Sequence, residues 1–104
     1  MNDFTIDEMA REDGVDLALS GDLDMSATFA LEPVLDRVLA DAPRELVLDL
    51  GEVPFVDSSG LGLLIATSER ARNADVSMAI TGAGPEIQRV FHIAGLDGVL
   101  PVRG

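Results

Sequence analysis

Residues 46–72 read LVLDLGEVPFVDSSGLGLLIATSERAR, and the rest of the chain is organised around them. Residues 46–50 form an apolar run of β-favouring side chains, which a glycine and a proline soon interrupt, so this run predicts a buried strand. Residues 60–72 place apolar side chains at helical spacing and end in charged residues, which predicts a helix. The centre of the chain is therefore a strand that turns sharply into a helix.

The turn itself consists of Asp57, Ser58, Ser59 and Gly60. Small polar residues of this kind are preferred at the N-caps of helices, and a glycine allows two backbone segments to approach closely. The sequence thus predicts two hydroxyl groups presented at the start of a helix.

The composition limits the chain to one small domain with a restricted chemistry. Its 104 residues can form a single core, so we expect one domain over residues 1–104. Cysteine is absent, which excludes disulfides and thiolate chemistry, and lysine is absent, which excludes a Walker-type phosphate site and Schiff-base catalysis. We expect no cofactor and no bound metal.

The charge of the chain is strongly negative. Nineteen acidic residues oppose seven basic ones, which gives a formal net charge of −12. A polyanion repels phosphate backbones and anionic lipids, so we expect no nucleic acid and no membrane as partner, whereas a basic protein surface is well suited. Because the N-terminus is acidic and no apolar run is long enough to span a bilayer, the sequence predicts a cytoplasmic protein.

Spacing patterns predict the remaining elements. These are a hairpin from residues 4–9 and 15–20, a strand over residues 76–80, a helix from Pro85 that ends at Gly95, and a final edge strand over residues 99–102. With the helix that precedes the central strand, the predicted order is β-β-α-β-α-β-α-β. This order is typical of an α/β fold with a mixed sheet whose second half is largely parallel.

The helix before the central strand contains a proline. Ser26 or Thr28 is the expected N-cap. Pro33 removes a hydrogen bond from a helix interior, so we expect the helix proper to begin only at residues 30–32.

Three passages resemble those of a known family. Residues 21–24 read GDLD after the second strand, residues 46–62 combine a strand with DSSGLG, and residues 84–96 hold a proline-containing helix that ends in Gly-Leu. In these passages the chain resembles a STAS domain, and specifically the stand-alone bacterial anti-sigma-factor antagonists. The resemblance implies a STAS-like mixed sheet with helices packed on it.

The resemblance also implies a function in partner switching. The unphosphorylated antagonist binds an anti-sigma factor that is also a GHKL-type serine kinase, and this binding releases the sigma factor. The kinase then phosphorylates the antagonist at the serine before the glycine, which is Ser59 here, and binding ends. A serine phosphatase would reverse the modification, and the antagonist itself would catalyse no reaction.

The resemblance assigns roles to the residues around Ser59. Asp57, Ser58 and Gly60 would shape the phosphoacceptor turn, and Asp24 would lie in a loop that faces a basic group of the anti-sigma factor. The implied partner contacts are Asp22, Asp24, Ser58, Ser59 and Leu61.

The sequence leaves other interpretations open. The turn at Ser59 could be only a capped junction between strand and helix, and the neighbouring carboxylates only solvated loop residues. A STAS domain could also be a structural subunit of a signalling or transporter-associated complex that phosphorylation does not switch. A serine hydrolase is disfavoured, because no G-x-S-x-G motif is present and the single histidine, His92, is predicted to lie on a helix beside Phe91. Whether the protein is a monomer or a dimer does not follow from its sequence.

Overall fold

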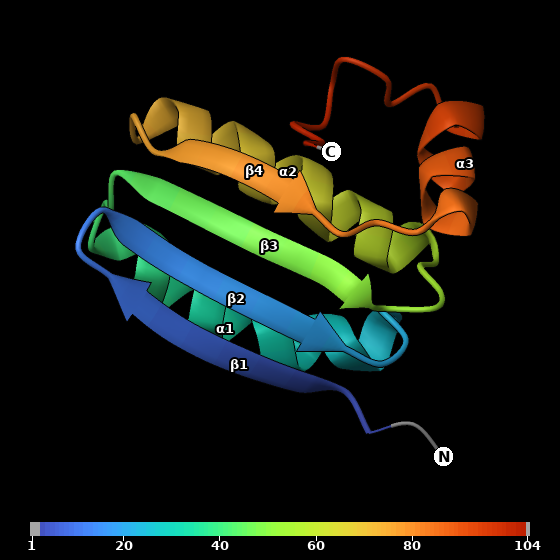
Figure 1. Ribbon diagram of the computed structural model, residues 1–104, viewed down its shortest axis with the longest axis horizontal. Coiled ribbons are helices and arrows are strands. Elements are labelled where there is room, and N and C mark those ends of the chain that lie inside the picture. The colour runs from blue at the N-terminus through green and yellow to red at the C-terminus, as the bar shows by residue number, and fades with distance from the viewer. Residues whose placement is uncertain (1–2, 104) are drawn as a thin grey trace.

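A four-stranded mixed sheet forms the centre of the protein (Figure 1). The structure is a computed structural model, and it describes residues 3–103. Strand β1 (Thr5–Arg11) pairs antiparallel with β2 (Gly14–Ser20), and β2 is followed across the sheet by the parallel strands β3 (Glu45–Glu52) and β4 (Ser77–Thr81). The helices are α1 (Met25–Ala40), α2 (Ser58–Asn73) and α3 (Pro85–Ile93).

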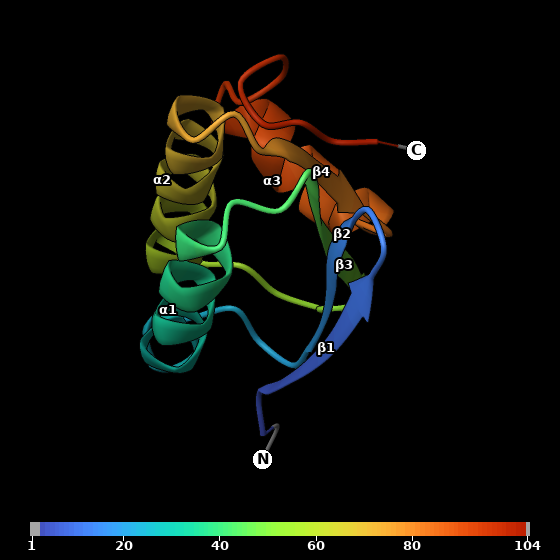
Figure 2. The ribbon, with the colours of Figure 1, turned by 90° about the vertical axis from the view of Figure 1, so that its left-hand side faces the viewer.

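Helices α1 and α2 cover one face of the sheet, and α3 lies beside the end of β4 (Figures 1 and 2). In the part of the chain that the structure describes, no helix covers the opposite face. Each of α1 and α2 connects two parallel strands, so both helices start at the edge where those strands end. The fold therefore brings the N-termini of α1 and α2 to the same end of the molecule.

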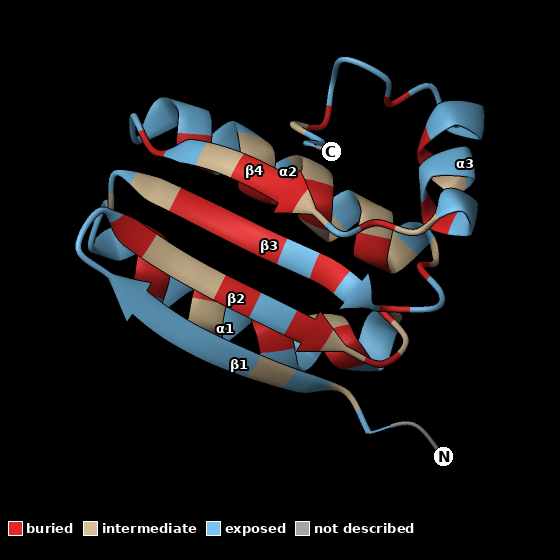
Figure 3. Ribbon diagram, viewed as in Figure 1, coloured by how far each residue is buried: buried red, intermediate tan, exposed pale blue. Residues whose placement is uncertain are grey.

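The core lies between the sheet and these two helices. Alternate side chains of the central strands point into it, as expected for a sheet with one covered face. Fully buried leucines come from the strands and from both helices: Leu17, Leu46, Leu48, Leu50, Leu31, Leu35 and Leu64. Figure 3 shows that buried positions are concentrated on β2, β3 and β4, whereas β1 is an exposed edge strand.

The predicted fold class is confirmed, but the predicted last strand is wrong. The chain reaches β4 only at an isolated parallel bridge between Ile80 and Val102. The Ile80 N–H donates to the Pro101 carbonyl (2.9 Å), and the Arg103 N–H donates to the Ile80 carbonyl (2.8 Å). Pairing cannot extend further, because Pro101 has no N–H to donate and Gly82 adopts a positive φ of 72° that ends β4.

The predicted late start of α1 and its predicted caps are also wrong. The helix begins at Met25, and Asp24 caps it instead of Ser26 or Thr28. Pro33 lies inside the helix on its exposed side, where the carbonyl that loses its hydrogen-bond partner can be solvated. The helix continues through the proline because its opposite side packs on the sheet.

The exposed edge strand β1 is tied to α1 by an ion pair. The Arg37 guanidinium donates to the Glu8 carboxylate, and this hydrogen bond lowers the pKa of Glu8. Because both groups are solvated, the pair contributes little to stability and serves mainly to connect the two elements.

Candidate functional site

The two loops that lead into α1 and α2 lie side by side. Leu23 and Val56 form a parallel bridge between them, and both side chains are buried. The Leu23 N–H donates to the Phe55 carbonyl (2.8 Å), and the Asp57 N–H donates to the Leu23 carbonyl (3.2 Å). These bonds fix the start of α2 against the start of α1.

Each helix start is capped by an aspartate. The Ala27 N–H donates to Asp24 Oδ1 (3.0 Å), and the Gly60 N–H donates to Asp57 Oδ1 (3.0 Å). Both aspartates have extended backbones, as N-cap residues do, and both are partly exposed. Because a carboxylate accepts more than one hydrogen bond, each can cap its helix and still accept from a partner. In both loops an apolar residue followed by aspartate precedes the helix. This repeated pair could have indicated Asp24 as the cap of α1, which the prediction of Ser26 or Thr28 missed.

The two serines occupy the first turn of α2. Ser58 is the first helical residue and is exposed, and Ser59 is the second and is partly exposed. The first intrahelical hydrogen bond of this turn runs from the Leu61 N–H to the Asp57 carbonyl (2.9 Å). The N–H groups of Ser58 and Ser59 lie ahead of this bond, at the positive end of the helix dipole. An anion beside these N–H groups would be favoured by the helix dipole.

Gly60 is buried against the neighbouring loop. A Cβ atom at this position would lie 2.3 Å from the Leu23 carbonyl oxygen and 2.9 Å from Leu23 Cγ. Only glycine allows this contact without a shift of the backbone. The expectation that glycine permits a close approach at the turn is confirmed.

All the residues predicted to form the phosphoacceptor turn or to contact the partner lie at this end of the molecule. Asp22 is partly exposed in the loop before α1, and Leu61 is partly buried and packs against the core. The structure thus brings together the two loops and the first turn of α2, although they are more than thirty residues apart in the chain. The roles of these residues in phosphorylation and partner binding stay predictions.

The capping role of Asp57 predicts a measurable loss of stability. Asp57→Ala removes the acceptor for the Gly60 N–H and is expected to lower the free energy of unfolding by about 1 kcal/mol. Asp57→Asn keeps an oxygen that can accept this hydrogen bond, so it should restore most of the loss. Urea unfolding of the three proteins checks this, and equal destabilisation by Ala and Asn would show that the negative charge matters and the cap does not.

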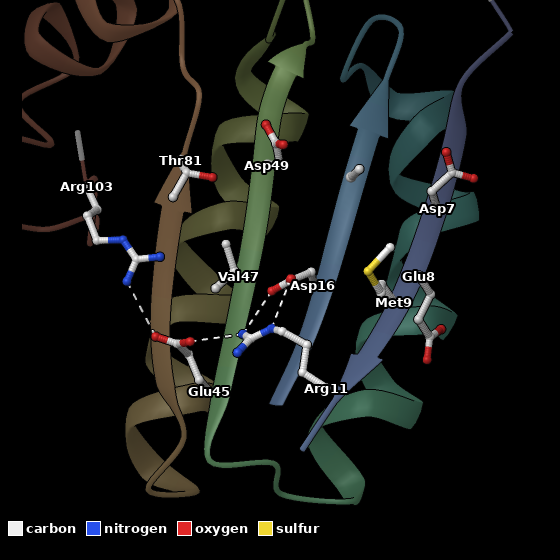
Figure 4. A pocket seen from close by; sticks show the side chains of 11 residues that line it. Asp7, Glu8, Met9, Arg11, Asp16, Glu45, Val47, Asp49, Thr81 and Arg103 are labelled. Carbon is white, nitrogen blue, oxygen red and sulfur yellow. Dashed lines mark hydrogen bonds and ion pairs between the residues drawn. The ribbon is translucent and has the colours of Figure 1, made fainter. Parts of the chain in front are cut away.

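A hollow of 540 Å³ lies on the uncovered face of the sheet (Figure 4). An ion-pair network crosses it, in which Arg11 donates to Asp16 and Glu45 (both 2.9 Å), and Arg103 contacts Glu45 at 3.5 Å. The hydrogen bonds from Arg11 to Asp16 and Glu45 raise the pKa of Arg11. None of the predicted site residues lines this hollow, so it is separate from the turn at Ser59.

Two further classes of site are absent from residues 3–103. No helix in this range has the length and apolar character needed to cross a bilayer. Nor does this range contain a group of three or more His, Asp or Glu side chains placed to hold a metal ion.

In comparisons with known proteins, the chain is similar to proteins named as antagonists of anti-sigma factors. The chain is 38% identical over 81 residues to the anti-sigma-F factor antagonist RsfB of Mycobacterium tuberculosis, an alignment that covers 78% of this chain and 66% of RsfB, just under two thirds of its length. It is 29% identical over 99 residues to an anti-sigma-B factor antagonist of Staphylococcus aureus, covering 95% of this chain and 92% of that protein.

A solved structure and a family model agree with these relatives. The crystal structure of an anti-sigma factor antagonist from Mycobacterium paratuberculosis superimposes with a TM-score of 0.86 and 33% identity, over 96% of this chain and 85% of that one. The family model described as "Mlab, STAS domain" matches residues 7–101. With this match over nearly the whole chain, the protein belongs to the STAS domain family.

Proposed function

We propose that this protein is an anti-sigma-factor antagonist whose binding is switched off by phosphorylation at Ser59. In this proposal the unphosphorylated protein binds an anti-sigma factor that is also a GHKL-type serine kinase, and it thereby releases a sigma factor. The observation that carries the proposal is the position of Ser59, which is partly exposed in the first turn of α2, two residues after the capping aspartate Asp57. The similarity to proteins named as antagonists of anti-sigma factors supports it.

In this proposal the partner kinase catalyses the phosphorylation of Ser59. The Ser59 hydroxyl oxygen attacks the γ-phosphorus of ATP, the bond to the β,γ-bridging oxygen breaks, and ADP leaves. A base of the kinase takes the hydroxyl proton. The protein described here supplies only the acceptor and the docking surface, so we propose that it is not an enzyme.

The modified protein is expected to remain folded. The phosphate would sit beside free N–H groups at the N-terminus of α2, where the helix dipole favours an anion. The two caps keep their own hydrogen bonds, because they accept from Ala27 and Gly60 and not from Ser59. Phosphorylation would therefore change the surface of the molecule and not its fold.

The effect on binding is electrostatic. A phosphate adds about −1.5 to −2 charges at neutral pH, two residues after Asp57, whose loop is hydrogen-bonded to the loop that carries Asp24. Enclosing this charge in a packed interface, with the loss of an interface hydrogen bond, would cost on the order of 2–5 kcal/mol. That range corresponds to a loss of affinity of roughly 30-fold or more.

A cycle of phosphorylation and dephosphorylation requires a further partner, a phosphatase. A serine phosphatase would remove the phosphate and return the protein to its binding form. Both steps would take place in the cytoplasm, where sigma factors act. The net charge of −12 supports a basic protein surface as the partner in place of nucleic acid or membrane.

The proposal is tested by mapping the modified residue. The protein is incubated with ATP and, in turn, with each purified GHKL-type serine-kinase anti-sigma factor of its own genome, and the modified residue is located by mass spectrometry. One kinase is expected to place a single phosphate on Ser59, with Ser59→Ala unmodified and Ser58→Ala modified like the unaltered protein. Phosphate on Ser58, or on neither serine with every kinase, would contradict the proposal. Tight binding to an assembly that Ser59→Asp does not disturb would instead support a structural subunit.

A further inference from the structure

The register of α1 against α2 is fixed by contacts at both ends of the pair. At one end, the bridge between Leu23 and Val56 joins the loops that precede the helices. Further along, the Arg70 guanidinium Nη1 donates to Asp36 Oδ1 at 2.7 Å. The two helices run in the same direction and pack against each other, so Asp36 on α1 lies opposite Arg70 on α2.

Helical periodicity extends this register back to the phosphoacceptor turn. Residues 7 and 11 positions apart lie on the same side of a helix. On α1 these steps lead from Asp36 to Phe29 and then to Met25, and on α2 the same steps lead from Arg70 to Leu63 and then to Ser59. This register predicts that Met25 lies on the side of α1 that faces α2, at the level of Ser59, with Phe29 one turn further along.

The two α1 side chains of this stripe are large, apolar and exposed. The exposed fraction is 59% for Met25 and 72% for Phe29, although buried positions such as Ala27 and Leu31 already supply the side of α1 that packs on the sheet. Phe55, which is half exposed, belongs to the loop bonded to Leu23 just before α1. We call Met25, Phe29 and Phe55 the apolar ridge. Large apolar side chains exposed on adjoining elements are typical of interaction surfaces, and aromatic side chains commonly contribute most of the binding energy.

We propose that the apolar ridge is a docking surface for the kinase that modifies Ser59, and that Phe29 is its main contact. This inference rests on the proposed function. The fitting partner surface is an apolar pocket with basic side chains at its border, because the ridge is adjoined by the capping carboxylates of Asp24 and Asp57. A second copy of this chain fits poorly, since it carries the same carboxylates and a net charge of −12.

The ridge gives the switch a physical mechanism. A phosphate on Ser59 would lie beside Met25, at the border of an apolar contact that excludes water. Charge in such a place must be desolvated for the partner to dock. Within residues 3–103, the hydrogen bonds made by arginine side chains go to carboxylates and not to Ser59, so none of these arginines offsets the charge. The kinase would thus dock in order to modify Ser59, and the phosphate would then oppose renewed docking on the same surface.

The test uses the kinase identified by phosphate mapping, loaded with a non-hydrolysable ATP analogue so that binding is measured without modification. Phe29→Ala is expected to raise the dissociation constant at least tenfold, and Met25→Ala several-fold. The matched control is Met9→Ala on β1, whose side chain is 65% exposed and lines the hollow on the uncovered face of the sheet; it should bind within twofold of the unaltered protein. With ATP, Phe29→Ala should raise KM about tenfold and leave kcat within twofold, and all variants should melt at the same temperature.

The possible results separate this inference from the proposed function. If Ser59→Asp loses binding while Phe29→Ala and Met25→Ala bind normally, the ridge proposal is overturned and the proposed function stands. If no kinase binds or modifies the protein, both are overturned. If the unaltered protein sediments as a dimer and Phe29→Ala as a monomer, the ridge belongs to self-association and the docking proposal is wrong.

Discussion

Ser59→Asp is expected to weaken binding to the anti-sigma factor by roughly 30-fold or more, without loss of folding. The added carboxylate would lie in the first turn of α2, two residues after the capping aspartate Asp57. A negative charge near a helix N-terminus favours the helix, so the stability should be unchanged or slightly higher. Isothermal titration calorimetry gives the affinity, and urea unfolding gives the stability.

Asn73→Asp is the matched control for added charge. Asn73 is the last residue of α2 and is exposed, so this change adds one negative charge to the same helix roughly 20 Å from Ser59. That separation exceeds the Debye length of about 8 Å at physiological ionic strength, so binding should be nearly unaffected. If both variants weaken binding equally, net charge controls affinity and the position of Ser59 has no special role.

Gly60→Ala is expected to lower the free energy of unfolding by about 2–3 kcal/mol, the largest effect on stability that we predict. The new Cβ would lie 2.3 Å from the Leu23 carbonyl oxygen and 3.0 Å from Val56 Cγ1. The contacted oxygen belongs to the backbone and itself accepts the Asp57 N–H, so the whole loop must move. For a domain of this size the melting temperature should fall by roughly 10 °C.

Gly62→Ala makes the same change two residues later and serves as the control. A Cβ at Gly62 would have no atom within 4 Å, so it would gain helix propensity without a clash. This variant should be more stable than the unaltered protein by about 0.5–1 kcal/mol. If Gly60→Ala is also stabilising, the close approach of the two loops does not hold the site together.

Local patterns in the sequence predicted most of the fold. The alternation along β2, the apolar run of β3 and the helical spacing of α2 reflect one covered sheet face, and each is visible within a few residues. The close approach at Gly60 was also predictable, because a glycine that follows small polar residues at a turn indicates that another backbone segment lies close to it.

Features that depend on tertiary contacts were predicted less well. Pro33 indicated a shorter α1, but packing of the buried side of the helix outweighs one lost hydrogen bond on its exposed side. The spacing of residues 99–102 indicated a strand, but Pro101 and the turn at Gly82 limit pairing with β4 to one bridge. Neither the start of α1 nor the extent of pairing at residues 99–102 can be judged from the sequence, because each depends on tertiary contacts of the element.

In the candidate site, too, local features could be predicted from the sequence and features set by tertiary contacts could not. The residues of the turn at Ser59 are consecutive, so their grouping was evident from the sequence. The register from which we infer that Met25 and Phe29 lie near that turn was not, because it depends on the contact between Asp36 and Arg70, which are 34 residues apart. Their exposure could only be read from the structure.

The central claim is that a phosphate on Ser59 prevents docking. The most direct test measures the affinity of one purified kinase, loaded with the non-hydrolysable ATP analogue, for the unphosphorylated protein and for the protein fully phosphorylated on Ser59. The account predicts that the phosphorylated form binds at least 30-fold more weakly while retaining the same melting temperature. Equal affinities within twofold would contradict it.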